Sequence, residues 1–277
     1  MGKFFFAYPP QASADLSLAR EYNHYLQLPA LGLGNGGAMV PRLLGHWPER
    51  SLGLLLEAVP GPDLDHLLLQ ACLQGDPAPL SRGLEKLAQL LAFFHFRPVP
   101  ALPVSPEPAL AYLDKVMAQL LEAGMLSRED WQALARERHT WEARFHDFSD
   151  RQVLIHGDAT PTNFLFPNGR AVALDLERLR AGDRLWDLSW VAGELKHAWG
   201  WRTSDFAGSE GAIRHFFRMY LTAPGLDPAL PLRLFNLNPF YMALAELRIA
   251  RNLYLTRDYR RELVAEARRC LAHGRRL

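Results

Sequence analysis

The apolar positions of this chain mostly recur at intervals of three and four residues, which is the spacing of one face of an α-helix. The clearest stripe is formed by Leu84, Leu87, Leu91 and Phe94. By the same pattern we predict helices over residues 14–26, 63–73, 84–95, 110–121, 127–144, 184–198, 213–221 and 239–255. The chain is therefore predicted to be mainly helical.

Short apolar runs without helical spacing occur at two places and predict strands. The first group surrounds the N-terminal helix and comprises residues 4–8, 40–45 and 51–59. The second lies in the middle of the chain and comprises Val153–Ile155, Phe164–Phe166 and Ala171–Leu174. The last two runs are separated by Pro167, Asn168, Gly169 and Arg170, which is a hairpin signal. This distribution predicts an α+β protein with its strands near the N-terminus and around residue 160.

Composition adds few constraints. The chain has 277 residues, 49% of them hydrophobic, and a formal net charge of +1. No basic stripe with interleaved aromatic residues indicates nucleic acid, and no apolar run is long enough for a signal peptide or a membrane span. Two cysteines, Cys72 and Cys270, are too few for a disulfide framework. We expect a cytoplasmic protein without nucleic-acid or membrane partners, and the sequence does not indicate an oligomeric state.

The candidate chemistry lies around the central strands. His156, Gly157 and Asp158 follow the first strand, Asn163 precedes the second, and Asp175 follows the third. A strand, loop and hairpin of this kind can bring Asp158, Asn163 and Asp175 to one edge. Two carboxylates and one amide oxygen suit a hard cation such as Mg²⁺ better than zinc.

The pattern His-Gly-Asp-x₄-Asn followed by Asp-x-Glu resembles the catalytic core of the aminoglycoside phosphotransferase and choline kinase family. This resemblance implies a protein-kinase-like fold of two lobes. We expect a small, truncated N-lobe with strands and one helix over residues 1–60. A larger, mainly helical C-lobe over residues 61–277 would carry the catalytic loop and the metal-binding hairpin.

The resemblance also implies roles for the residues of the motif. Asp158 would accept the proton of an acceptor hydroxyl or orient that hydroxyl, and Asn163 and Asp175 would hold Mg²⁺. Glu177, which would point the same way as Asp175 along a strand, would reach the metal or a cationic substrate, or form a salt bridge. His156 would fix the loop rather than transfer a proton, although a histidine base is plausible in isolation.

In the N-lobe the resemblance implies a nucleotide site that departs from the family pattern. Glu21 would pair with a strand lysine that holds the phosphates, but the expected lysine position falls on Phe6 or Ala7, and Lys3 fits only if the strand is shifted. The segment from Glu57 to Val59 would form the hinge that meets the adenine. The family's usual two strands and glycine-rich turn before the lysine are missing, and the glycines between Gly32 and Gly37 form either a flexible loop or a substitute phosphate cradle.

The function expected from these residues is transfer of the γ-phosphoryl group of ATP, with Mg²⁺, to a hydroxyl of a small molecule of the aminoglycoside, sugar or amino alcohol type. The incomplete N-lobe leaves a second hypothesis, a catalytically weak or inactive kinase-like protein that binds or regulates. Four tryptophans between Trp186 and Trp201 would form either core packing or an aromatic box for a quaternary ammonium group.

Overall fold

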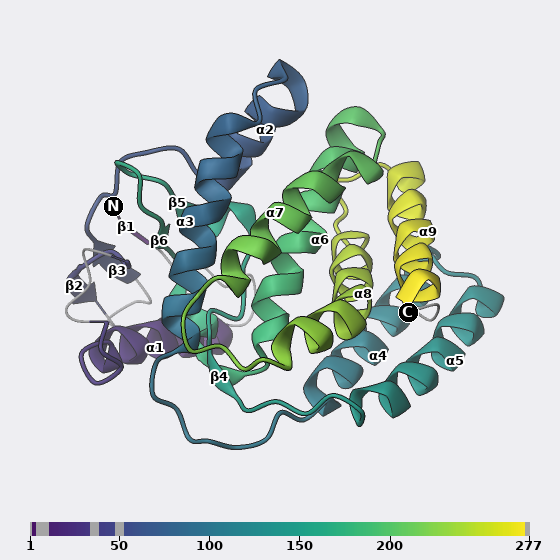
Figure 1. The fold of residues 1–277 in the computed structure, drawn as a ribbon, viewed down its shortest axis with the longest axis horizontal. Coiled ribbons are helices and arrows are strands. Elements are labelled where there is room, and N and C mark those ends of the chain that lie inside the picture. Colours follow the sequence, from purple (N-terminus) through teal and green to yellow (C-terminus); the bar gives the residue numbers. More distant parts are fainter. Residues whose placement is uncertain (1, 4–10, 34–38, 48–52, 275–277) are drawn as a thin grey trace. The chain divides into compact units, whose positions relative to one another are not determined.

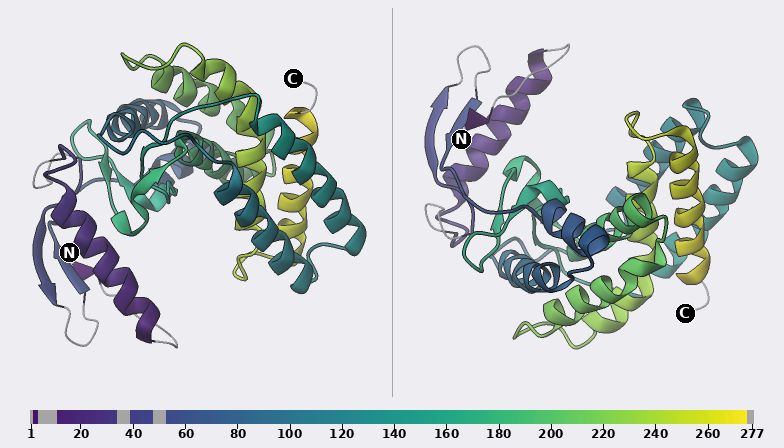
Figure 2. Two further views of the ribbon diagram at one scale, coloured as in Figure 1. Left: turned by 90° about the horizontal axis from the view of Figure 1, so that it is seen from below. Right: turned by 90° about the horizontal axis from the view of Figure 1, so that it is seen from above.

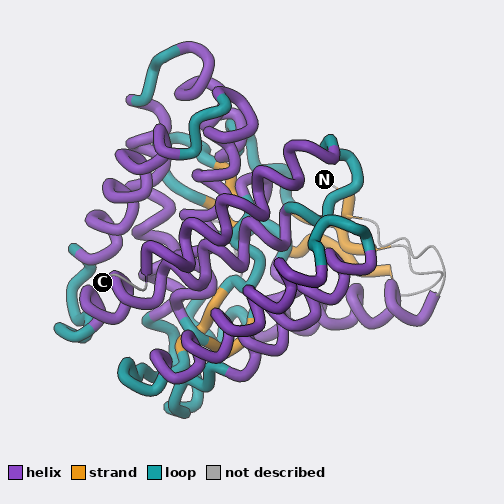
Figure 3. Tube along the Cα trace, turned by 90° about the vertical axis from the view of Figure 1, so that its right-hand side faces the viewer, coloured by secondary structure: helices purple, strands orange, loops and turns teal. Residues whose placement is uncertain are grey.

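The computed structural model describes residues 2–3, 11–33, 39–47 and 53–274. Helices make up most of these residues, and the strands are short (Figure 3). The strand predicted over residues 4–8 and Gly34, Gly36 and Gly37 of the glycine-rich stretch lie outside the described residues. The chain divides into two compact units, which are residues 1–99 with 153–181, and residues 100–152 with 182–277. The predicted boundary between lobes at residues 60 and 61 stays a prediction.

The first unit begins with an antiparallel sheet and a helix. Strands β1 (Gly2–Lys3), β3 (Gly53–Leu56) and β2 (Leu43–Trp47) pair in that order. Helix α1 (Gln11–Gln27) contacts β3, and Figure 2 shows the helix lying along the sheet. The helix buries Leu18, Tyr25 and Leu28, so its apolar positions follow the helical spacing seen in the sequence.

The rest of the first unit supports the central strands. Helix α2 (Leu64–Gln74) packs on α3 (Ala78–His95), whose predicted stripe is fully buried and contacts β4 (Val153–Ile155). Strand β4 pairs with β7 (Arg180–Gly182). Strands β5 (Phe164–Leu165) and β6 (Val172–Ala173) form the predicted hairpin. All three residues of β4 are buried, so the loop that follows starts from a rigid support.

The second unit is helical. It contains α4 (Glu107–Glu122), α5 (Arg128–Phe145), α6 (Arg184–Thr203), α7 (Glu210–Leu221), α8 (Leu230–Ile249) and α9 (Arg257–Gly274). Helix α8 is central in this unit because it packs against α4, α6 and α9, as Figure 1 also shows. The helix predicted over residues 239–255 is displaced. Helix α8 starts at Leu230, continues through Pro239 and ends at Ile249, before α9 begins.

None of the helices in the described part of the chain has the length and hydrophobicity of a membrane-spanning segment.

Candidate active site

The loop after β4 depends on a glycine. Gly157 has a φ of 81°, and a Cβ atom there would collide with the carbonyl oxygen of Arg178 and the guanidinium of Arg180. The segment from Arg178, which ends a 3₁₀ turn, to Arg180, which begins β7, therefore lies close against the loop. Glycine adopts this positive φ readily and has no Cβ atom that would collide. The chain can therefore turn here and present Asp158 directly after the buried strand.

His156 ties the same loop to the hairpin. Its ring is fully buried and makes two hydrogen bonds, one at each nitrogen. Nε2 lies 2.8 Å from the carbonyl oxygen of Leu174, and Nδ1 accepts the N–H of Asp158 at 3.3 Å. Both bonds are satisfied by one neutral tautomer that donates from Nε2. This geometry supports the loop-fixing alternative for His156.

We expect the His156→Gln variant to lower kcat by about tenfold without changing the shape of the pH profile, because the ring positions Asp158 and transfers no proton. The measurement is kcat and kcat/KM for phosphoryl transfer from about pH 5.5 to 9, a range that includes the ordinary titration range of histidine. If the pH profile of the variant instead lacked the rise or the fall seen in the wild type, His156 would be the acid–base group.

Hydrogen bonds bring Asp158, Asn163 and Asp175 to the same end of the β5–β6 hairpin. The Asn163 side chain donates from Nδ2 to the backbone carbonyl of Asp158 at 2.9 Å. The backbone carbonyl of Asn163 accepts the N–H of Leu174 at 2.8 Å. Phe164 pairs with Ala173, so Asn163 enters the hairpin where Asp175 leaves it. The main chain at these three positions therefore lies at one end of the hairpin, while the convergence of their side chains on one metal ion stays a prediction.

The prediction that Glu177 continues the strand of Asp175 is wrong. Asp175 adopts the left-handed conformation, with φ 55° and ψ 69°, and a 3₁₀ turn over Leu176–Arg178 follows. The turn directs Glu177 to α1, where it accepts the hydroxyl of Ser17 at 2.7 Å and lies 3.8 Å from Arg20. These contacts correspond to the salt-bridge alternative for Glu177.

Glu21 reaches the same turn from α1. Its side chain is completely buried, and Oε1 accepts the backbone N–H of Leu176 at 3.3 Å. His24, one turn further along α1, lies 2.6 Å from the carbonyl oxygen of Leu176. Burial lowers the pKa of His24 more than the backbone bond raises it. The helix that carries the predicted Glu21 is thus anchored to the residue directly after Asp175.

The other residues predicted to bind the nucleotide lie on and after the strands of the N-terminal sheet. Lys3 lies on β1, opposite Leu54 of β3, and its side chain lies outside what the structure describes. Glu57 follows β3 and accepts the Arg42 Nε–H at 3.1 Å, a hydrogen bond that lowers the pKa of this exposed carboxyl. Beyond Val59, Pro62 accepts the N–H of Phe166 at 2.9 Å. The chain just after the predicted hinge is therefore attached to the β5–β6 hairpin.

Sequence reasoning missed one residue of the site. Arg178, at the end of the 3₁₀ turn, places Nε 3.9 Å from the Asp158 carboxylate, and 55% of its side chain is exposed. A basic residue three positions after Asp175 is visible in the sequence, but only the turn brings it back to the loop. Arg178 adds an exposed positive charge beside the candidate base.

Comparison with known proteins places the chain in a family. The model of the phosphotransferase enzyme family (APH) matches residues 2–232. The chain belongs to this family. Membership confirms the resemblance drawn from the His-Gly-Asp motif, and it confirms the predicted enzyme class, an ATP-dependent small-molecule kinase. A comparison with curated protein sequences found no significant match.

Solved structures of the phosphotransferase family and of related kinases share the fold. ADP-bound aminoglycoside phosphotransferase APH(2'')-Ib is 15% identical with a TM-score of 0.60, covering 95% of this chain and 83% of its own. APH(3'')-Id from Streptomyces rimosus, bound to ADP and streptomycin, is 21% identical with a TM-score of 0.55 and coverages of 85% and 84%. A choline/ethanolamine kinase family protein from Mesorhizobium loti is 16% identical with a TM-score of 0.60 and coverages of 97% and 85%. These likenesses confirm the α+β, kinase-like fold.

The four tryptophans between Trp186 and Trp201 do not gather into one box. Trp186 stacks on Trp190 at 4.9 Å, and both rings contact Tyr112 of α4. Trp201 instead packs on Tyr259 of α9 at 4.8 Å. With Trp190 only 2% exposed, this pattern corresponds to the packing alternative.

Proposed function

We propose that this phosphotransferase moves the γ-phosphoryl group of Mg-ATP to a hydroxyl group of a small molecule. One observation carries the proposal: the hydrogen bonds of His156 and Asn163 hold the Asp158 loop against the end of the hairpin that bears Asp175. Phosphoryl transfer requires positioning and charge neutralisation more than covalent chemistry. A rigid loop with oxygen ligands and nearby positive charge meets both requirements.

Asp158 is the proposed base. Its side chain is 22% exposed, so it is held by the loop yet remains accessible to a hydroxyl group. In the proposed reaction it accepts the hydroxyl proton or orients the hydroxyl for in-line attack. Arg178, 3.9 Å away, is placed to compensate negative charge that accumulates around Asp158 and the transferred group.

Asn163 and Asp175 are the proposed holders of Mg²⁺. The Asn163 amide donates its N–H to the backbone, and its oxygen has no hydrogen bond within the described part of the chain. Among the described residues, no three His, Cys, Asp or Glu side chains form a metal cluster. This fits Mg²⁺, which takes one or two carboxylates and completes its shell with water and substrate phosphates. When bound, the ion would neutralise phosphate charge. Glu177, held by Ser17, is proposed to fix the turn rather than bind the metal.

The proposed nucleotide site uses the N-terminal residues. Glu21 steadies the turn after Asp175, Lys3 lies on the first strand of the sheet, and the hinge from Glu57 to Val59 would meet the adenine. In this proposal residues 1–60 act as the small lobe and residues 61–277 as the large one. The acceptor class is proposed to be an aminoglycoside, a sugar or an amino alcohol, since similar structures include aminoglycoside phosphotransferases and a choline/ethanolamine kinase family protein.

A binding experiment tests the metal and nucleotide assignments together. We expect ATP to raise the Tm of the wild-type protein, and to raise it further when Mg²⁺ is present, because the ion and the nucleotide bind only to the folded state. The Asp175→Asn variant removes one carboxylate of the metal site. We expect it to need about tenfold or more Mg²⁺ for the same shift. The measurement is a thermal-shift titration of Mg²⁺ at fixed ATP.

Asp63→Asn is a suitable control because this carboxylate lies in the same unit and caps α2 through the N–H of His66, a bond that asparagine can keep. Its Mg²⁺ titration should match that of the wild type. An unchanged titration in Asp175→Asn would rule out the metal assignment. No shift with millimolar ATP in the wild type would favour the catalytically weak or inactive binding protein.

A further inference from the structure

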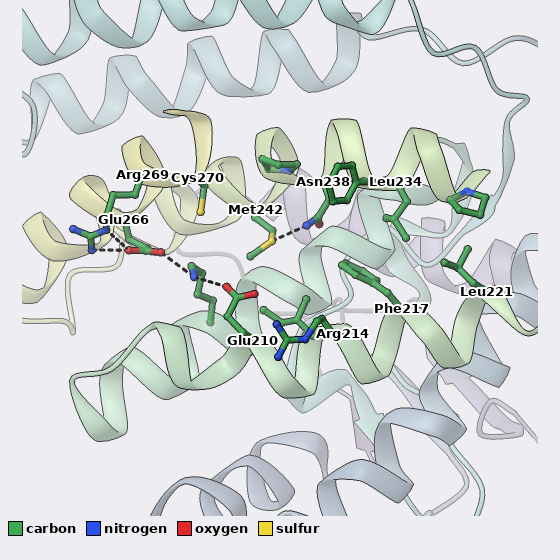
Figure 4. A pocket seen from close by; sticks show the side chains of 15 residues that line it. Glu210, Arg214, Phe217, Leu221, Leu234, Asn238, Met242, Glu266, Arg269 and Cys270 are labelled. Carbon is green, nitrogen blue, oxygen red and sulfur yellow. Dashed lines mark hydrogen bonds and ion pairs between the residues drawn. The ribbon is translucent and has the colours of Figure 1, made fainter. Parts of the chain in front are cut away.

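The helical unit contains a cavity, which the proposed reaction does not use. Its volume is about 590 Å³, within the range of roughly 300–1,000 Å³ typical of small-molecule sites. Helices α7, α8 and α9 form its walls (Figure 4). Helix α6 contributes Lys196. All lining residues belong to the second unit.

The two ends of this cavity differ in chemistry. Figure 4 shows Phe217, Leu221 and Leu234 at one end, and Glu210, Glu266 and Arg269 at the other. Phe235, another lining residue, remains 58% exposed. An apolar surface beside a charged region fits a ligand with an apolar body and a charged group.

The charges at the polar end are mostly paired with each other. The buried Lys196 ammonium lies 2.9 Å from Glu266 and 3.3 Å from Glu210. Arg269 donates from Nε to Glu266 at 2.6 Å. The two glutamates are therefore already neutralised by Lys196 and Arg269, which leaves little unmatched negative charge to bind a cation.

Arg214 is the exception to this pairing of the charged residues that line the cavity. It lines the cavity from the exposed side of α7, and within the described residues its guanidinium has neither a hydrogen bond nor an ion pair. Figure 4 shows it between the charged group and Phe217. A planar guanidinium with free donors binds a carboxylate through two parallel hydrogen bonds. The unmatched charge of the cavity is thus positive and lies next to its apolar wall.

Asn238 adds an acceptor on the opposite wall. Its Nδ2 lies 2.9 Å from the sulfur of Met242, while Oδ1 is buried and has no hydrogen-bond partner among the described residues. A buried acceptor without a partner costs free energy unless a ligand supplies a donor. The wall therefore favours a ligand that also carries an N–H or O–H group.

We propose that this cavity binds a small amphipathic organic acid. Its carboxylate pairs with Arg214, its apolar body packs against Phe217 and Leu234, and a donor on it reaches Asn238. The site is separate from the phosphotransferase reaction, so binding here does not depend on the roles proposed for Asp158 and Asp175.

Calorimetric titration with three probes of one shape tests the proposal. These are indole-3-acetate, the neutral indole-3-acetamide and the cationic tryptammonium, and all three carry a ring N–H donor for Asn238. We expect the anion to bind the wild type at least about tenfold more tightly than the other two, because only the anion forms an ion pair with Arg214. The Arg214→Gln variant should lose about tenfold in affinity for the anion and lose the preference for it.

Arg218→Gln is the matched control. Arg218 lies one turn further along α7, is exposed and does not line the cavity, so its variant removes the same charge from the same helix. It should bind the anion within about twofold of the wild type, since Arg218 does not line the cavity and solvent screens its charge from a ligand there. The Asp175→Asn variant should also retain binding. The proposal would be overturned if the anion did not bind, or if all three probes bound with equal affinity. It would also be overturned if Arg214→Gln and Arg218→Gln lost the same affinity, or if only Asp175→Asn lost affinity.

Discussion

The Asp158→Asn variant is expected to transfer phosphoryl groups about 10²–10⁴ times more slowly than the wild type, while its Tm stays within a few degrees. The amide keeps the shape of the side chain, and the main-chain groups of Asp158 that bond His156 and Asn163 are unchanged. What is lost is the carboxylate that accepts or orients the hydroxyl proton. The measurement is ADP release with a panel of aminoglycosides, amino sugars and amino alcohols.

Asp76→Asn provides the control for this experiment. Asp76 is exposed in the same unit, and its side chain caps the N–H of Ala78, a bond that asparagine can also form. Its turnover should equal that of the wild type. An Asp158→Asn variant with wild-type turnover would remove Asp158 from the reaction. A wild-type protein that binds nucleotide but releases no ADP with any acceptor would support the binding-protein hypothesis instead.

The part of the site that could be predicted from the sequence is the part determined by neighbouring residues. The hairpin was predicted from Pro167, Asn168 and Gly169, and the structure confirms it. Asn168 and Gly169 have φ values of 49° and 73°, and Arg170 closes the turn by donating to Pro167 at 3.1 Å. Asparagine and glycine tolerate these angles, so the turn chemistry determines the register that places Asn163 beside Leu174.

The features that the sequence did not reveal depend on contacts between distant segments. The left-handed conformation of Asp175 has no local signal, yet it redirects Glu177 to Ser17, 160 positions away in the sequence. The same turn returns Arg178 to Asp158. The prediction also misplaced the limits of helix α8, for a related reason. Helix α8 is buried on nearly all sides and carries a proline, so its apolar residues show no stripe that marks its limits.

The buried ion pair between Asp183 and Arg233 in the second unit was also not predicted from the sequence. Asp183 caps α6 by accepting the N–H of Leu185, and it accepts two hydrogen bonds from Arg233 at 2.8 and 2.6 Å and one from Tyr241 at 2.7 Å. Burial alone would raise the pKa of Asp183. The charge and hydrogen bonds of Arg233, with those of Tyr241 and Leu185, outweigh burial and hold this pKa below its ordinary value.

The Asp183→Asn variant is therefore expected to lower the free energy of unfolding by about 3 kcal/mol at pH 7, because it leaves the buried Arg233 guanidinium facing a neutral amide. The loss lies at the lower end of the range for broken buried pairs, since Asp150, 3.5 Å from Arg233, remains.

Urea unfolding followed by tryptophan fluorescence measures this loss, and all tryptophans except Trp47 lie in this unit. Asp258→Asn, at a 90% exposed position paired with Arg261, should change stability by no more than about 0.5 kcal/mol. Because the folded pKa of Asp183 is depressed, its contribution is complete above about pH 4 to 5 and is lost as the pH falls through the folded pKa. The difference between wild type and Asp183→Asn must then narrow in acid, and a difference that stayed constant down to about pH 3 would contradict an ionised Asp183 in the core.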